Sequence, residues 1–286
     1  MSTPTAVASE VWQSRDLLRN LISKELKVRY KGSVLGFAWS LVTPLLMAAV
    51  FTVVFATFLR VPFGNGNFTV FFLAGYLVWQ FFQNSVTASA GSIIGNGPLI
   101  SKVYFPRELI PFSLVISQGV HLLLALLAVT PLILYYRGFH PQLLPAIVVA
   151  LLLISLFTAG VSMLFGALTV KFRDLLELLQ VLMMTWFYLT PVIYSIETVR
   201  GLSNGERWVD VLRLNPMTWF AELFHTLLYG IALPIDPGDP TGGVPHPPPT
   251  IPDAATWLWC LGWAVFAFTF GYVVFRRSAS SFVKEI

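Results

Sequence analysis

Charged residues are scarce in this 286-residue chain, which contains 18 lysines and arginines and 14 aspartates and glutamates. They make up 11% of the sequence, whereas soluble domains contain roughly a quarter. A soluble globule of this length would need more charge to cover its surface. Cysteine is nearly absent too, since Cys260 stands alone, and this excludes a disulfide scaffold. With 56% hydrophobic residues, the composition indicates an integral membrane protein rather than a nucleic-acid-binding one.

The usual sequence signatures of catalysis are also missing. The chain has no G-x-x-x-x-G-K-[ST] phosphate loop, so we do not expect it to hydrolyse ATP. It has no G-x-S-x-G nucleophile motif, and its four histidines stand too far apart in sequence to suggest a metal site. We therefore predict a transport subunit with no catalytic residue, metal or cofactor of its own.

Long apolar runs are what the chain does contain. Six runs without Asp, Glu, Lys or Arg occupy residues 35–59, 68–90, 109–136, 141–170, 178–196 and 257–275. About 20 residues cross a bilayer as a helix, and these runs are too long for barrel strands. We predict an all-α membrane protein with one six-span domain over residues 35–275, and the lack of carboxylates in the spans argues against proton-coupled transport.

The distribution of basic residues predicts the orientation. Thirteen of the 18 basic residues lie in residues 1–34, 91–108, 171–177 and 276–286, which are the loops on the side of the two termini. By the positive-inside rule, both termini face the cytoplasm, with residues 276–286 as a cytoplasmic tail in the plasma (inner) membrane. Within residues 1–34, apolar and basic side chains separate onto two helical faces, which predicts an amphipathic helix along the membrane surface.

On the opposite side, two further segments differ from ordinary loops. Asn215 and Pro216 form a helix start, and the apolar stretch that they begin is too short to cross a bilayer. We predict re-entrant or interfacial outer helices over residues 207–229, followed by a proline-rich outer loop at residues 231–256.

Polar and aromatic residues in the spans suggest a path for a hydroxyl-rich substrate, since flat rings stack on sugars and amides at membrane depth need a partner. Packing between helices is the alternative explanation. The channel-lining candidates are Trp39, Tyr76, Trp79, Gln80, Asn84, Trp186 and Tyr188. His121 lies inside an apolar run, and we interpret it mainly as a hydrogen-bonded packing residue.

Several sequence blocks resemble the ABC-2 type permeases that export polysaccharides, namely the Wzm-type transmembrane subunits of O-antigen, capsule, galactan and teichoic-acid exporters. The blocks are ELKVRYKGSVLGFAWSLVTPLLMAAVF at 25–51, LISKVYFPRELIP at 99–111, FRDL at 172–175, TPVIY at 190–194 and the Asn215–Pro216 pair. They occur in the family's order over nearly the whole chain. The proline-rich outer loop departs from the compact family pattern.

The resemblance implies a homodimer paired with two copies of a separate ATPase subunit, which binds ATP and Mg. It also implies a polyprenyl-pyrophosphate-linked polysaccharide as substrate, for assembly of the cell envelope. The coupling segment at 91–108 would contact the ATPase through Leu99, Lys102, Tyr104, Phe105 and Arg107. The outer helices would form a gate with Trp219, Glu222 and His225. Lys27, Arg29 and Lys31 lie where the lipid pyrophosphate would first meet the protein.

Two other functions remain open from the sequence. One is an ABC-2 permease for a drug or small lipid, which would share the topology without needing a polymer-wide channel. The other is an intramembrane acyl- or glycosyltransferase that uses His121, or Glu222 with His225. The scarcity of carboxylates near the spans disfavours this second alternative.

Overall fold

The computed structural model describes residues 14–33, 36–58, 67–102, 105–230, 248–279 and 282–285. Within these ranges the regular secondary structure is entirely helical, with no β-strand. The predicted all-α class is therefore confirmed. Most of the predicted proline-rich loop, residues 231–247, lies outside the described ranges, and residues 248–253 precede the next helix without regular structure.

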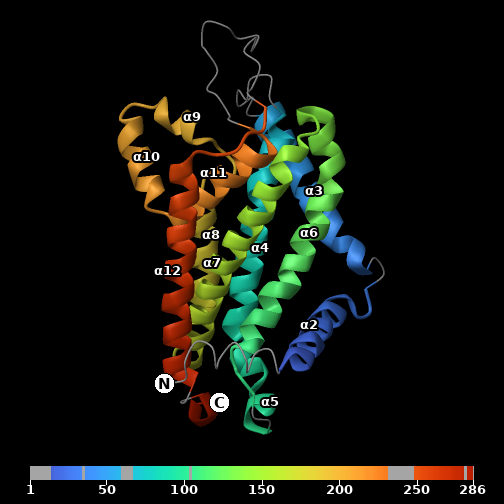
Figure 1. The fold of residues 1–286 in the computed structure, drawn as a ribbon, viewed down its shortest axis with the longest axis vertical. Coiled ribbons are helices and arrows are strands. Elements are labelled where there is room, and N and C mark those ends of the chain that lie inside the picture. The colour runs from blue at the N-terminus through green and yellow to red at the C-terminus, as the bar shows by residue number, and fades with distance from the viewer. Residues whose placement is uncertain are drawn as a thin grey trace, which may run out of the picture.

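The helices run between two ends of the molecule (Figure 1). In chain order they are α2 Arg15–Tyr30, η1 Gly36–Ala38, α3 Trp39–Phe51, η2 Thr52–Phe58, α4 Phe68–Gly95, α5 Gly97–Lys102, α6 Leu109–Arg137, η3 Pro141–Leu143, α7 Leu144–Lys171, α8 Leu175–Tyr188, α9 Ile196–Arg200, α10 Gly205–Arg213, α11 Pro216–Leu228, α12 Ala254–Ala279 and α13 Phe282–Glu285. Helices α2, α5 and α13 lie at the lower end in Figure 1, and α9, α10 and α11 lie at the upper end.

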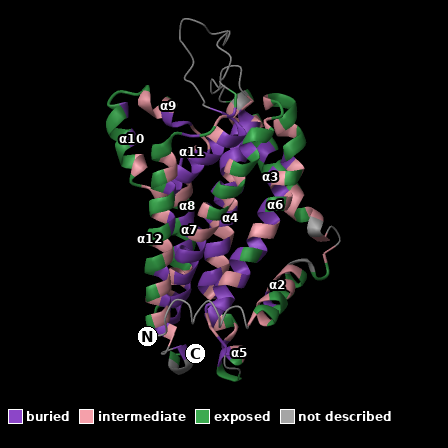
Figure 2. Cartoon of the chain, in the orientation of Figure 1, coloured by how far each residue is buried: buried purple, intermediate pink, exposed green. Residues whose placement is uncertain are grey.

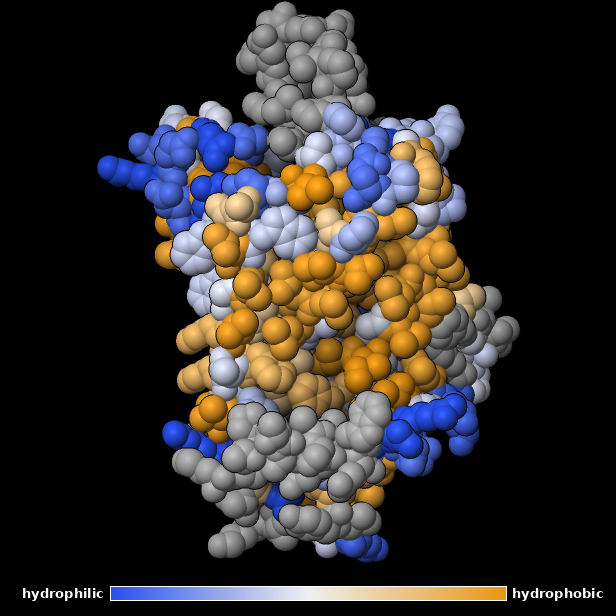
Figure 3. Space-filling view, viewed as in Figure 1, coloured by the Kyte–Doolittle hydropathy of each residue, from blue (hydrophilic) through white to orange (hydrophobic). Residues whose placement is uncertain are grey.

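Three helical segments of the described chain are long and apolar enough to cross a bilayer by these criteria alone: Leu109–Arg137, Pro141–Lys171 and Ala254–Ala279. The shorter apolar segments Trp39–Phe55 and Leu175–Tyr188 run beside them. On the face drawn in Figure 3, a band of apolar side chains separates two hydrophilic ends. This distribution matches a protein whose middle lies in hydrocarbon and whose ends lie in water.

Helix α4 forms the centre of the fold and is largely buried (Figure 2). It packs against α6, α7 and α11, and Phe82 on α4 stacks on Phe157 of α7 with ring centroids 5.6 Å apart. Helix α12 is more exposed, with apolar residues such as Phe266 on its outer surface. Because that surface lies in the apolar band, these side chains face lipid or another subunit rather than water.

The fifth apolar run ends as a helix earlier than residue 196, since α8 stops at Tyr188. Pro191 has no backbone N–H to continue the helix, and the Asn215 side chain satisfies groups at its end. Asn215 Nδ2 donates to the Leu189 carbonyl at 3.1 Å and to Thr190 Oγ1 at 3.0 Å. Its Oδ1 accepts from the Met217 N–H at 3.0 Å, which confirms the predicted N-cap of α11.

Helices α7 and α12 make a close backbone approach through two glycines. A Cβ atom built on Gly160 of α7 would lie 2.3 Å from the Ala267 backbone. A Cβ atom built on Gly271 of α12 would lie 2.0 Å from the Gly160 carbonyl oxygen. Small residues permit such contact where no hydrophobic force drives helices together inside a membrane. The two helices therefore form a rigid pair.

We expect Gly160→Ala to destabilise the protein by about 1–3 kcal/mol, because the new methyl group overlaps fixed backbone rather than a flexible side chain. Gly262→Ala is the matched control, since no atom lies within 4 Å of a Cβ at that position on α12. Thermal unfolding of both purified variants in detergent measures the difference. Equal melting temperatures for the two variants would contradict the close approach.

Candidate functional site

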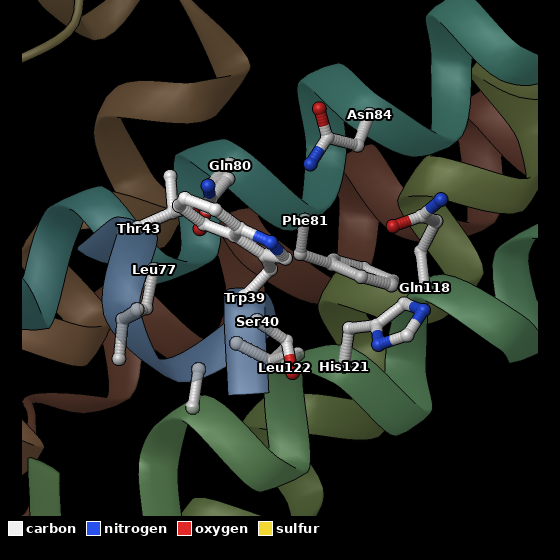
Figure 4. Close-up of a pocket in the computed structure, with 11 residues that line it drawn as sticks. Trp39, Ser40, Thr43, Leu77, Gln80, Phe81, Asn84, Gln118, His121 and Leu122 are labelled. Atoms are coloured by element: carbon white, nitrogen blue, oxygen red, sulfur yellow. The ribbon is translucent and has the colours of Figure 1, made fainter. Parts of the chain in front are cut away.

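A cavity of about 100 Å³ lies inside the apolar band between α3, α4 and α6. Figure 4 shows the Trp39 indole from α3 reaching across it beside Gln80, while Gln118 and His121 lie next to one another on α6. Its lining consists of Trp39, Ser40, Thr43, Leu77, Gln80, Phe81, Asn84, Gln118, His121, Leu122 and Ala125. None of these side chains is a carboxylate, lysine or arginine, so the cavity presents amide, hydroxyl, imidazole and aromatic groups.

Helical spacing brings the polar groups of the cavity together. Gln80 and Asn84 are separated by one helical turn on α4, and Gln118 and His121 by one turn on α6. Polar side chains inside hydrocarbon require partners or water, and these four side chains line one shared cavity. Gln118 was not among the channel candidates from the sequence. Its position one helical turn from His121 could have indicated that the two side chains share a face of the helix.

Of the seven channel candidates, Trp39, Gln80 and Asn84 share this cavity, whereas the other four lie elsewhere. Trp79 is buried and donates its Nε1–H to Gln83 Oε1 at 2.9 Å. Trp186 meets Trp79 edge to face and donates to Asn215 Oδ1 at 2.7 Å. Tyr76 is half-buried and stacks on Phe72, and Tyr188 is exposed on α8. These contacts are those of helix packing, and a channel role for the four residues stays a prediction.

The headgroup candidates lie on or beside the amphipathic helix α2 at the lower end. Lys27 and Lys31 are exposed, and the Arg29 side chain lies outside the described part of the structure. Lys24 of the same helix donates to Asn96 Oδ1 at 3.1 Å. This hydrogen bond connects helix α2 to the coupling segment, which comprises residues 91–108.

That coupling segment forms the short helix α5 and then leads into α6. Lys102 is exposed and Leu99 is half-buried, while Phe105 and Ile100 belong to a small apolar cluster below the main core. Tyr104 lies outside the described residues. The Arg107 guanidinium lies over the Phe282 ring, 6.0 Å from its centroid.

The outer helix α11 carries the three gate candidates. Trp219 donates its Nε1–H to the Arg213 carbonyl at 2.9 Å. Glu222 and His225 line a second cavity of about 80 Å³ together with Glu197 and Ser195. The His225 ring stacks on Phe71 of α4, with centroids 3.9 Å apart.

Burial shifts the pKa of both titratable groups on α11, which is too short to span the membrane. It raises the pKa of Glu222 to about 7 and lowers the pKa of His225 to about 3, because each loses solvation of its charged form. A Cβ at Gly75 would come within 2.6 Å of His225 Nε2, so the imidazole fits only because that residue of α4 is glycine. Neutral forms of both groups suit this apolar site.

The described residues contain no group of three or more His, Cys, Asp or Glu side chains placed to hold a metal ion. His121 lines the cavity between α3, α4 and α6, whereas Glu222 and His225 share the second cavity. The two candidate sites for acid–base chemistry are therefore separate.

Comparison with known proteins places these features in a family. Residues 16–229 match the ABC-2 type transporter family. The chain is 37% identical over 204 residues, covering 71% of this chain and 76% of the relative, to the O-antigen export system permease protein RfbA of Klebsiella pneumoniae. It is 33% identical over 230 residues, covering 79% of this chain and 85% of the relative, to the protein of that name from Myxococcus xanthus. The chain belongs to the ABC-2 type transporter family.

Proposed function

We propose that this chain is the channel-forming subunit of an ATP-driven exporter of polyprenyl-pyrophosphate-linked polysaccharide. Two copies of the chain would form the channel, and two copies of a separate ATPase subunit would supply the energy. The observation that carries the proposal is the uncharged cavity in the apolar band, lined by Gln80, Asn84, Gln118 and Trp39. Amides and aromatic rings bind sugar hydroxyls and faces weakly, which permits sliding, whereas ionic groups would hold a polymer in place.

The size of the cavity supports a channel shared between subunits. Its volume of about 100 Å³ is below the roughly 300–1,000 Å³ of pockets that enclose a small ligand. One copy of the chain therefore offers part of a wall rather than a complete binding site. A second copy facing this wall would complete a path for a chain of sugars. The two relatives are named as permeases of O-antigen export systems, which agrees with such a substrate.

The two ends of the molecule fit the proposed orientation with six spans. Basic residues of α2, α5 and the end of α12, such as Lys27, Lys102 and Arg277, gather at one end, which we assign to the cytoplasm. Lys27 and Lys31, which are exposed, would meet a lipid pyrophosphate, and α5 would contact the ATPase. Helices α10 and α11 at the other end would form the re-entrant outer gate.

Co-expression with the ATPase gene encoded nearest to this one tests the proposal. We expect a stable complex that hydrolyses ATP, and hydrolysis should rise when lipid-linked polysaccharide is added to the reconstituted complex. The double variant Lys27→Glu with Lys31→Glu should assemble but lose most of this stimulation, since like charges repel the pyrophosphate. Stimulation by a drug or short lipid instead would favour the small-substrate alternative, and glycosyl or acyl transfer without ATP would favour the enzyme.

The cavity makes a separate prediction about substrate passage. Replacing Gln80 and Asn84 together by leucine removes two amides from the cavity wall, and we expect polymer export per assembled complex to fall about tenfold, an effect of the size of one or two hydrogen bonds. Gln83→Leu is the matched control on the same helix, because Gln83 lies outside the cavity and bonds Trp79 instead. Surface-exposed polysaccharide, measured at equal complex levels, reports the difference. Equal export by both variants would exclude the cavity from the path.

The outer helix makes a prediction about pH. In the unfolded chain Glu222 ionises near 4.5, and in the folded protein near 7. Between pH 4.5 and about pH 7, Glu222 is protonated in the folded protein and ionised in the unfolded chain. The free energy of unfolding therefore falls as pH rises through this range, and above about pH 7 Glu222 contributes no further change. We expect the Glu222→Gln variant to lack this pH-dependent loss of stability. Its melting temperature should exceed that of the wild type by a difference that increases with pH up to about pH 7. Glu206→Gln is the control, since the Glu206 side chain is 74% exposed. Melting temperatures of the wild type and Glu222→Gln that change in parallel with pH would contradict the raised pKa of Glu222.

A further inference from the structure

The coupling segment contacts the lower end of α12 through side chains that no sequence motif predicted. Arg276 Nε of α12 lies 3.0 Å from Glu108 Oε1, whose side chain is only 8% exposed. Arg107, the neighbouring residue, donates through its guanidinium to the Ala279 carbonyl at the end of α12. The Glu108 carboxylate has little access to water, whereas Arg276 is 35% exposed. Separation of the two elements would leave this nearly buried carboxylate without its partner and therefore costs free energy.

The small helix α13 strengthens this junction. Phe282 is fully buried and meets Phe275 of α12 edge to face, with ring centroids 5.3 Å apart. It belongs to one apolar cluster with Ile100 of α5 and Phe105 of the coupling segment. Arg173, in the connection between α7 and α8, donates to the Glu285 carbonyl at 3.4 Å. The lower end of α12 is thus held to the coupling segment by both charge and apolar packing.

The upper end of α12 contacts the outer helix α11 through a stack of aromatic rings. Trp259 of α12 lies parallel to Trp219 of α11, with centroids 5.4 Å apart and an interplanar angle of 17°. The Arg213 guanidinium lies over the same Trp219 ring at 5.2 Å. A stacked pair of this kind contributes stabilisation beyond the area that it buries, so it favours joint movement of the two helices.

Between its two ends, α12 has the properties of a rigid connector. Its 26 residues extend about 39 Å at 1.5 Å per residue, and they contain no proline. The Gly160–Gly271 contact fixes it to α7 near the middle. A displacement at one end would therefore move α12 together with α7 instead of bending it.

We propose that α12 carries movement of the ATPase-coupling segment to the outer helix α11, with the Glu108–Arg276 ion pair as its lower joint and the Trp259–Trp219 stack as its upper joint. This inference rests on the proposed function, since it requires an ATPase partner that moves the coupling segment. Helix α4 offers a rival route, because it leads directly into the coupling segment and contacts His225 of α11 at Gly75. The two routes predict different behaviour when the lower joint of α12 is broken.

Hydrogen–deuterium exchange on the complex with its ATPase, in phospholipid nanodiscs, separates these routes. Exchange is compared without nucleotide and after trapping with ATP and orthovanadate, in peptides from the coupling segment and from α11. The wild type should respond to trapping in both. In Arg276→Met the coupling segment should still respond, while the response of α11 should shrink at least about fivefold, the lower end of the usual range for energetic coupling.

Arg277→Met is the matched control, because that neighbouring arginine is exposed on α12 whereas the ion pair with Glu108 is made by Arg276, so α11 should respond as in the wild type. Trp259→Ala removes the stack that forms the upper joint, and its half-exposed position makes misfolding of this variant less of a concern. It should reduce the response of α11 to the same extent, so the proposal can be tested even if Arg276→Met does not fold. A wild-type response of α11 in both joint variants, or no response of α11 in the wild type, overturns the proposal. Failure of the wild-type complex to form or to hydrolyse ATP counts against the proposed function instead.

Discussion

Between the two polar ends of this protein there is no water to bond a backbone N–H or an amide side chain, and this constraint accounts for most of what the fold contains. Backbone groups bond one another within helices, and several polar side chains find partners inside the bundle. Asn215 shows the constraint at a helix junction, where its amide serves the end of α8 and the start of α11 at once. Trp79 and Gln83 satisfy each other within one turn of α4.

The same constraint explains where the polar cavity lies and why it is uncharged. Gln80, Asn84, Gln118 and His121 face one another because none of them could face lipid at low cost. Charged pairs occur instead at the two ends: Glu108 with Arg276 at the lower end, and Arg200 with Glu197 and Glu206 on α9 and α10 at the upper end. Uncharged groups in the middle and ionic contacts at the ends are the arrangement that the proposed function requires.

The sequence predicted some local features well because their causes are local. Asn215 followed by Pro216 is a helix start wherever it occurs, and the structure places an N-cap there. The amphipathic pattern of residues 15–30 likewise produced the helix α2, with Leu17, Leu18 and Leu21 turned to the apolar cluster. The end of α8 at Tyr188 has a local cause in Pro191. By contrast, the Asn215 side chain that bonds the Leu189 carbonyl at this end lies 26 residues further along the chain, and no local pattern reveals that contact.

The amino-acid sequence by itself determined that this is a helical membrane protein, which end carries the basic residues and which family it resembles, because these follow from composition, periodicity and motif order. Only the tertiary structure decided that Trp39, Gln80 and Asn84 share a cavity with Gln118 and His121, whereas Trp79 and Trp186 pack together in the core. It also joined Glu108 to Arg276 and Trp219 to Trp259. The physical reason is that each helix can rotate and slide against its neighbours, and the close approach at Gly160 and Gly271, with packing around α4, selects one arrangement that no single segment specifies.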